Sequence, residues 1–294
     1  MNILVTGGAG FIGSNVVDRA LERGHLVKII DNLSTGFESN LNPQCEFINA
    51  DICDYQTIEK HFKGIDVVFH LAALPRVEPS IHDPLPYNKV NIEGTLSVLD
   101  ACKNNGVKKI IFSSSSSIYG DCGNNPVDEE YRKNPLSPYA LQKLVCEEYF
   151  KLYYMLFGVN SICLRYFNVY GNRQPQNGSY VPVVGIFFKQ LGDDKPLTVT
   201  GDGEQIRDFV NVLDVAEANL LGAESNLAGY NYFNIGSGKN YKILDIAKKI
   251  SYNIEYIEER TEPKSTLANI QRAKKLLGWT PEIDLMEWIN ENKK

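Results

Sequence analysis

A glycine-punctuated turn near the N-terminus limits what this chain can fold into more than any other feature. The apolar run Ile3–Val5 leads into Thr6-Gly7-Gly8-Ala9-Gly10-Phe11-Ile12-Gly13, and apolar residues then recur at helical spacing. This pattern predicts a strand, a tight turn and a helix. Gly7 would allow the turn, Gly10 would let backbone N–H groups approach a pyrophosphate, and Gly13 would let the helix lie close to the strand. A glycine-rich loop without a ligand is the alternative, which the spacing alone leaves open.

A carboxylate at the end of the next apolar run strengthens the dinucleotide interpretation. The run Leu26–Ile30 ends at Asp31, 18 residues after Gly13. A βαβ unit places an acceptor for the adenosine ribose 2′-OH at this position. Because Asp31 would repel a 2′-phosphate, we expect NAD rather than NADP.

Composition excludes several classes of protein. The chain has 294 residues, 43% apolar content and a mean hydropathy of −0.24, which fits one large or two closely associated globular domains. A net charge of −6 argues against nucleic acid or an anionic membrane as the main partner. We see no export signal and no 18-residue apolar run, so we expect no membrane span and a cytoplasmic location. Six cysteines without a Cys-x-x-Cys pair and only four histidines predict reduced thiols and no metal site.

Strands and helices alternate through the first half of the chain. Apolar runs at 26–30, 45–50, 65–70, 108–113 and 159–164 are separated by helical stretches at 56–62, 92–104 and 138–157. This alternation predicts an α/β fold with a Rossmann-type, doubly wound parallel sheet in residues 1–165. From residue 166 the alternation is lost, so residues 166–294 are predicted to form a smaller C-terminal α/β substrate lobe. Segments 209–225 and 230–236 are expected to return to the first domain.

Short polar or small-residue clusters follow the predicted strands. They are Asp51-Ile52, His70-Leu71-Ala72-Ala73 and the serine run 113–117. Ligands of an open α/β sheet bind outside the carboxyl ends of its strands, so these clusters should face the cofactor. Asp51 can accept a hydrogen bond from the adenine amino group. We expect His70 to be a structural residue rather than a catalyst.

A tyrosine and a lysine one helical turn apart are the candidate catalytic pair. Ser137 and Pro138 are suited to the N-cap and the first position of a helix, which places Tyr139 and Lys143 on one face. An ammonium about 4 Å from a phenol is worth roughly 4 kcal/mol at an effective dielectric constant near 20, or about three pKa units. Tyr139 could then act as a base near neutrality, while a serine from 113–117 steadies the substrate oxygen. Tyr and Lys at this spacing are also common on helices that have no catalytic role. The catalytic interpretation therefore depends on the nucleotide turn and the serine run being present in the same chain.

The same helix carries a second, apolar repeat. Leu141, Val145, Tyr149, Leu152 and Leu156 recur at helical spacing, and we expect them to form its buried stripe.

Motifs spread over nearly the full length carry a resemblance to a known family. They are Thr6–Gly13, Asp31–Gly36, Asp51-Ile52, His70–Ala73, Asn91 with Gly94-Thr95, Ser113–Gly120, Tyr139 with Lys143, Arg165–Gly171, Gly201–Gly203 and Arg207–Phe209. On these residues the chain resembles the extended short-chain dehydrogenase/reductase family, and within it the UDP-hexose 4-epimerases.

The resemblance implies an enzyme that keeps NAD bound through turnover. Ser115 would be the catalytic serine, Tyr139 the base and Lys143 its partner. The cofactor contacts implied by the resemblance and by the patterns above are Gly7, Gly10, Phe11, Ile12, Gly13, Asp31, Asn32, Leu33, Thr35, Gly36, Asp51, Ile52, Leu71, Ala72, Ala73, Asn88, Ser113, Tyr139, Lys143 and Tyr166. The substrate contacts would be Arg76, Ser115, Ser117, Tyr139, Asn168, Ser179, Tyr180, Thr198, Arg207, Arg260 and Thr266. Of these, Asn168, Arg207 and Arg260 would hold the UDP diphosphate.

The implied reaction is epimerisation without net redox. Tyr139 would take the proton of the sugar 4-OH while a hydride leaves C4. The 4-keto sugar would then turn about its diphosphate link before the hydride and the proton are returned. Helices 92–104 and 138–157 would form a four-helix bundle in a homodimer; packing within the monomer is the alternative.

Departures from the family patterns narrow the choice of reaction and substrate. Ser116 and Ser117 stand where dehydratases carry an acid pair and decarboxylases a glutamate, which disfavours both. Thr266 leaves room in the pocket, so UDP-GlcNAc and UDP-GalNAc are expected beside UDP-Glc and UDP-Gal. Arg76 can contact a carboxylate, which keeps UDP-glucuronate 4-epimerase open. A net oxidoreductase of this fold and a non-catalytic NAD-binding protein are the remaining alternatives.

Overall fold

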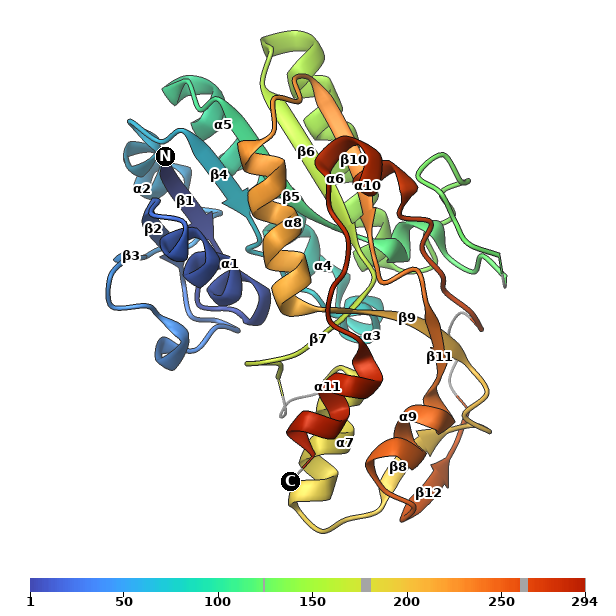
Figure 1. Ribbon diagram of the computed structural model, residues 1–294. Helices are drawn as coiled ribbons and strands as arrows, with labels where there is room; N and C mark the ends of the chain where they lie inside the picture. Colours follow the sequence, from blue (N-terminus) through green and yellow to red (C-terminus); the bar gives the residue numbers. More distant parts are fainter. Residues whose placement is uncertain (124, 176–180, 260–263, 294) are drawn as a thin grey trace.

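A seven-stranded parallel sheet forms the body of the molecule (Figure 1). The computed structural model describes residues 1–123, 125–175, 181–259 and 264–293. The strands lie in the order β10-β6-β5-β4-β1-β2-β3. Their bounds are β1 (Asn2–Thr6), β2 (Leu26–Asp31), β3 (Glu46–Asn49), β4 (Val67–His70), β5 (Lys109–Ser115), β6 (Asn160–Tyr166) and β10 (Tyr230–Ile235). The strand order reverses between β1 and β4, which is where such a sheet opens a crevice for a ligand.

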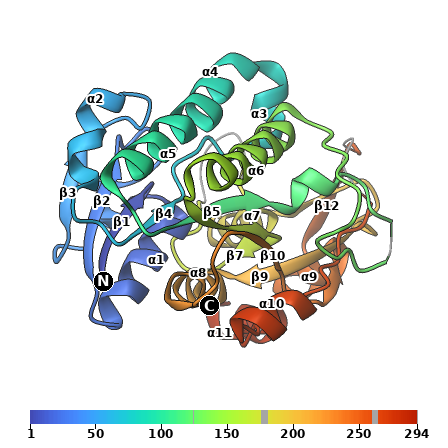
Figure 2. The same ribbon diagram turned by 90° about the horizontal axis from the view of Figure 1, so that it is seen from above.

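Helices cover both faces of this sheet, as the view from above shows (Figure 2). Helices α1 (Phe11–Glu22) and α8 (Val212–Glu224) lie on one face, where Val16 and Ala20 enter the core. Helices α5 (Gly94–Asn105) and α6 (Pro138–Phe157) lie on the other, where Val98 and Phe150 are buried. The predicted Rossmann-type fold is confirmed. Across the described residues, no helix is long and apolar enough to cross a membrane.

The face that α6 buries was predicted wrongly. Leu141, Leu152 and Leu156 are 51%, 42% and 62% exposed. The helix instead turns Tyr139, Ala140, Gln142, Lys143, Cys146, Glu147 and Phe150 toward the sheet. The outer face of α6 is apolar, whereas the inner face mixes apolar residues with Gln142, Lys143 and Glu147. Periodicity therefore identified a real stripe but assigned it to the wrong side.

A smaller lobe is built after β6. Its three-stranded sheet contains β7 (Asn168–Tyr170), β9 (Ile206–Asn211) and β11 (Asn240–Lys242), and a second pair joins β8 (Leu197–Thr200) to β12 (Ile254–Ile257). Helices α7 (Val183–Gly192), α9 (Ile243–Ile250) and α11 (Leu285–Asn292) enclose a separate core that includes Phe187, Ile246 and Leu285. The chain returns through α8 and β10, which pairs with β6 in the main sheet. The remaining helices are α2 (Tyr55–Ile58), α3 (Val77–His82), α4 (Pro84–Asn88) and α10 (Gln271–Leu277).

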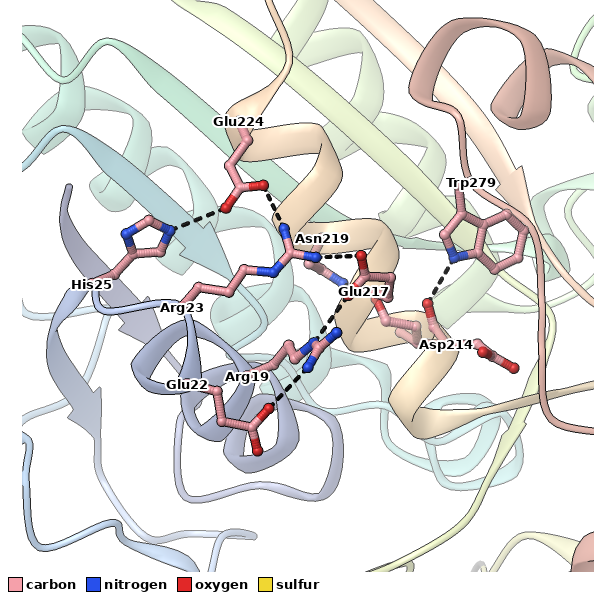
Figure 3. A network of polar contacts seen from close by, with 10 residues as sticks. Arg19, Glu22, Arg23, His25, Asp214, Glu217, Asn219, Glu224 and Trp279 are labelled. Atoms are coloured by element: carbon pink, nitrogen blue, oxygen red, sulfur yellow. Dashed lines mark hydrogen bonds and ion pairs between the residues drawn. The ribbon is translucent and has the colours of Figure 1, made fainter.

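An ion-pair network fastens α1 to α8 (Figure 3). Arg19 Nε lies 2.9 Å from Glu217 Oε2. Arg23 bridges Glu217 and Glu224, and His25 Nε2 lies 3.2 Å from Glu224 Oε1. The Glu217 side chain is only 27% exposed and serves both arginines, so its pairs are less screened than isolated surface pairs.

Replacing Glu217 with glutamine should lower the free energy of unfolding by about 1 kcal/mol at low salt, and less at high salt. Glu22→Gln is the matched control, because Glu22 is 63% exposed and, among the described residues, its ion pair is with Arg19. Urea unfolding of both variants at two ionic strengths measures the difference. Equal effects of the two substitutions would contradict a role for the network.

Candidate active site

The three glycines of the N-terminal turn differ in what surrounds them. Gly7 has a φ of +77°, and a side chain there would come within 2.6 Å of Ala72 N. A side chain at Gly13 would lie 2.1 Å from Gly7 O, so the helix could not approach the strand. A side chain at Gly10 would meet only Gly7 O, at 3.2 Å. Gly7 and Gly13 are therefore needed by the fold, whereas Gly10 keeps one side of the turn open.

The N-terminus of α1 is suited to an anion. Its N-cap is Gly10, which has no side chain to cap the first turn, and no acidic residue lies in that turn among the described residues. Phe11 and Ile12 open the helix directly after β1, at the point where the strand order reverses. Backbone donors and the helix dipole then face the place where a pyrophosphate would lie, so these residues fit a dinucleotide.

Asp31 is buried and fixed at the end of β2. Its carboxylate accepts hydrogen bonds from Ala9 N at 3.0 Å and Leu33 N at 2.8 Å. Beside it, Asn32 Nδ2 donates to Asp51 Oδ2 at 3.1 Å. The predicted ribose and adenine acceptors thus lie together, next to the glycine turn.

Other predicted cofactor residues lie close to the same turn. Phe37 N donates to Ala9 O at 3.0 Å, which folds the loop bearing Thr35 and Gly36 back onto the turn. Leu71 N donates to Thr6 O, which places the segment after β4 beside β1. Ile52 is buried, and Leu71, Ala72 and Ala73 are half-buried.

A chain of polar groups crosses the core behind the turn and contains His70. The Thr95 hydroxyl donates to Asn91 O at 2.6 Å, so it accepts from His70 Nε2 at 2.9 Å. His70 Nδ1 then accepts from the Thr6 hydroxyl at 2.7 Å. Burial, with a smaller effect from Lys143, lowers the pKa of His70 to about 3. His70 is therefore a neutral structural residue, as we expected.

Lys143 occupies the buried side of α6. Its Nζ donates to Ser113 O at 2.7 Å, and lies 4.7 Å from the centre of the Phe112 ring and 5.9 Å from that of Tyr139. Burial lowers the pKa of Lys143 to about 8, while electrostatic interactions with Cys146, Cys163 and Glu147 act in the opposite direction. A desolvated ammonium beside the phenol ring is the arrangement that stabilises a phenolate.

Tyr139 and the serine run lie at the same edge. Ser137 Oγ accepts from Ala140 N at 3.2 Å, and Pro138 follows it, which confirms the predicted N-cap of α6. Tyr139 is 9% exposed, and its N–H donates to Ser80 Oγ at 3.2 Å. Ser115 caps a short 3₁₀ turn by accepting from Ser117 N at 3.2 Å. The Ser117 hydroxyl oxygen is buried and makes no hydrogen bond within the described structure.

Two predicted nicotinamide contacts lie in different surroundings. Tyr166 is buried in β6 opposite Ser115 of β5, and its hydroxyl bonds the Asn219 side chain at 3.0 Å. Asn88 ends α4 and is exposed. Three residues on, in a π-helical segment, Asn91 is buried and binds both backbone groups of Leu74.

The predicted substrate residues of the smaller lobe gather around β9. Asn168 Nδ2 donates to Asp208 O at 2.7 Å, and Arg207 is buried with Nη1 on Ile206 O at 3.0 Å. Thr266 Oγ1 accepts from Asp208 N at 3.2 Å.

Thr198 lies apart on β8, where its hydroxyl accepts from Gln190 Nε2 at 2.8 Å. Arg76 is half-buried just before α3. Ser179, Tyr180 and Arg260 lie outside the described residues.

Sequence reasoning missed two buried charges beneath the site, Glu147 and Arg165. Arg165 Nη2 lies 2.6 Å from Glu147 Oε2, and the side chains are 2% and 1% exposed. A carboxylate one turn beyond Lys143 and an arginine inside an apolar strand are unusual placements. These two unusual charges could have been noticed in the sequence, but their positions do not reveal that they pair with each other.

A parallel sheet with a glycine turn at its switch point and a Tyr–Lys pair beside it defines a dinucleotide-binding α/β protein. A model of the NAD dependent epimerase/dehydratase family matches residues 3–236. The chain belongs to this family, which confirms the resemblance to epimerases of the extended short-chain type and the prediction of NAD as cofactor.

Named relatives match over nearly the whole chain. A protein described as a putative UDP-glucose 4-epimerase of Methanocaldococcus jannaschii is 43% identical, over 98% of this chain and 95% of that protein. The UDP-N-acetylglucosamine 4-epimerase of Methanobrevibacter ruminantium M1, solved with UDP-N-acetylmuramic acid, is 40% identical with a TM-score of 0.93, covering 99% of this chain and 96% of that one. The UDP-glucose 4-epimerase of Thermotoga maritima, solved with UDP-glucose, is 38% identical with a TM-score of 0.94, covering 98% and 96%.

Stability should depend on pH through His70. The unfolded chain takes up a proton near the ordinary pKa of 6.5, but folded His70 does so only near pH 3. The free energy of unfolding should therefore fall as pH falls through this window, by roughly 2 kcal/mol between pH 7 and pH 5. Denaturant titrations should show this loss in the wild type and in His82→Gln, an exposed control, and a smaller loss in His70→Gln. Equal losses in all three would contradict the assignment.

Proposed function

We propose that this protein is an NAD-dependent 4-epimerase of UDP-hexoses. The observation that carries the proposal is the buried Tyr139–Lys143 pair, held against the serine strand end across the crevice from the glycine turn. Residues 1–165, with return segments 209–225 and 230–236, would bind NAD. Residues 166–294 would bind the UDP-sugar.

The chemistry follows from the positions of these side chains. The glycine turn and Asp31 would hold NAD, which would supply reversible hydride-transfer chemistry at the sugar C4. Tyr139, held as a phenolate by the Lys143 ammonium, would take the proton of the 4-OH and give it back. Ser115 would hold the substrate oxygen. The Ser117 hydroxyl is buried without a hydrogen-bond partner among the described residues, and a sugar hydroxyl could supply one. The 4-keto sugar turns between the two half-reactions.

Positive charge in the smaller lobe would hold the UDP group. Arg207 is buried on β9, two residues before Phe209. Phe209 pairs with Asn168 of the neighbouring strand β7. We propose that Arg207, Asn168 and Arg260 bind the diphosphate, since arginine binds phosphate oxygens in a fork. Thr266 hydrogen-bonds β9 and is small, so the pocket would accept an N-acetyl group.

A sugar acid is the second candidate class of substrate, because Arg76 supplies a cation before α3. The Methanobrevibacter relative was solved with UDP-N-acetylmuramic acid, itself a sugar acid by name. A UDP-glucuronate 4-epimerase, or another nucleotide-sugar dehydrogenase of this fold, would use the same Tyr–Lys pair.

Purified protein mixed separately with UDP-Glc, UDP-GlcNAc and UDP-GlcA should invert at least one sugar at C4, as NMR of the products would show. Tyr139→Phe should reduce the rate by about 10²- to 10⁴-fold while NAD stays bound. Stoichiometric consumption of added NAD(P)H would indicate a net oxidoreductase and contradict the proposal. If the protein inverts UDP-Gal but not UDP-GalNAc, the hypothesis that it accepts N-acetylated sugars is excluded.

We also propose a homodimer formed through α6 and α5. The outer face of α6 exposes Leu141, Leu152, Met155 and Leu156. A row of large apolar side chains on one helix is typical of an interface. A second copy would cover it with the same row, related by twofold symmetry.

Leu152→Glu should convert the dimer to a monomer in light scattering, because a carboxylate cannot be buried unpaired in an apolar interface. Tyr252→Glu is the control, since Tyr252 is 86% exposed away from α6. A wild-type monomer, or a dimer that survives Leu152→Glu, would contradict this interface.

A further inference from the structure

A buried carboxylate joins the three elements that carry the candidate chemistry. Glu147 of α6 accepts from Arg165 Nε at 2.9 Å and from the Ser114 hydroxyl at 2.5 Å through Oε1. Its Oε2 accepts from Arg165 Nη2 at 2.6 Å. Ser114 belongs to β5 and Arg165 to β6, so one side chain ties a helix to two adjacent strands.

Each partner in this cluster is next to a residue of the candidate site. Glu147 follows Lys143 by one helical turn. Ser114 lies between Ser113, whose carbonyl holds Lys143, and Ser115. Arg165 precedes Tyr166 and pairs in register with Ser114. A shift of α6 relative to β5 would therefore break this cluster and displace the Tyr–Lys pair together.

Stability alone does not explain the ion pair. Removing two charges from water costs several kcal/mol per ion, and well-packed apolar residues often replace such a pair without loss. Arg165 makes further hydrogen bonds through Nη1, which lies 2.9 Å from the Tyr119 hydroxyl and 2.8 Å from Glu129 O. The ion pair is bidentate and directional, and such geometry fixes a register between elements.

Glu147 also acts on the charge of Lys143. The groups that face Lys143 are the Ser113 carbonyl and the Phe112 ring from β5, His70 from β4, Cys163 from β6, and Tyr139, Cys146 and Glu147 from its own helix. His70 is neutral, and burial raises the pKa of both cysteines. Apart from Tyr139 itself, Glu147, balanced by Arg165, is thus the anion of this described set, and its charge favours the protonated lysine.

We propose that Glu147 and Arg165 are positioning residues, which hold the Tyr139–Lys143 helix in register with the serine strand end and keep the lysine charged. This inference rests on the proposed epimerase function. Neither residue need touch the substrate.

The test compares Glu147→Gln with Glu148→Gln, since Glu148 is the exposed neighbour of Glu147 and undergoes the same chemical change. With a UDP-sugar that the wild type inverts, Glu147→Gln should lower kcat by about 10- to 100-fold and leave KM within about threefold, because misplaced groups cost rate rather than binding. Its high-pH loss of activity should move to lower pH, because the anion that favours the protonated lysine is lost while the buried guanidinium of Arg165 remains. Glu148→Gln should match the wild type.

Two further variants separate positioning from folding and from charge. Ser114→Ala removes one hydrogen bond but keeps the ion pair, and should lower kcat by about three- to tenfold with an unchanged pH profile. Glu147→Gln combined with Arg165→Met removes both charges, so the pH profile should return toward the wild type while kcat stays low.

The inference has its own failing results. It is overturned if Ser114→Ala and a folded Glu147→Gln both keep wild-type kcat and pH dependence. A Glu147→Gln protein that fails to fold leaves Ser114→Ala as the deciding variant, and wild-type kcat there overturns the inference. A wild type that inverts no UDP-sugar instead overturns the proposed function, and this inference with it.

Discussion

The hydrogen bond from Lys143 to the Ser113 carbonyl is the contact on which the site depends. It anchors an ammonium 2.7 Å from the end of β5, in surroundings that lower the pKa of Lys143 to about 8. Because the cation cannot leave for water without unpacking α6, it must remain beside the ring of Tyr139. The helix, strand end and phenol are thereby assembled as one unit, and burial makes the charge effective.

The fold explains why this unit lies opposite a nucleotide site. Strands β1 and β4 are neighbours at the point where the strand order reverses, and the glycine turn follows one of them. The segment after β4 comes so close that only glycine fits at position 7. Lys143 and the serine run belong to the same carboxyl edge, so a dinucleotide held by the turn would extend toward Tyr139. The smaller lobe is entered directly after β6, where Asn168 begins β7, and β7 pairs with β9, which carries Arg207.

Much of this arrangement was readable from the sequence, for identifiable reasons. Strand and helix periods differ, so the alternating elements could be predicted, and Ser137 with Pro138 is a local signal that starts α6 where it was expected. The buried face of α6 was predicted wrongly, because the regular apolar stripe lies outside while the inner face carries Gln142, Lys143 and Glu147. The Glu147–Arg165 pair joins residues 18 apart on a helix and a strand, and only the packing of those elements brings them together. Thr198 shows the same limit, since its hydroxyl is taken by Gln190 of a neighbouring helix.

The central claim is that the phenol of Tyr139 ionises near neutrality because of Lys143, and spectroscopic titration of the NAD-bound protein tests it directly. The difference in tyrosinate absorbance between the wild type and Tyr139→Phe isolates this one phenol, and the same difference is taken on a Lys143→Met background. The account predicts an ionisation about three pH units below the ordinary pKa of about 10 in the presence of Lys143, and a return toward that ordinary value without it. An ordinary tyrosine titration on both backgrounds would contradict the account.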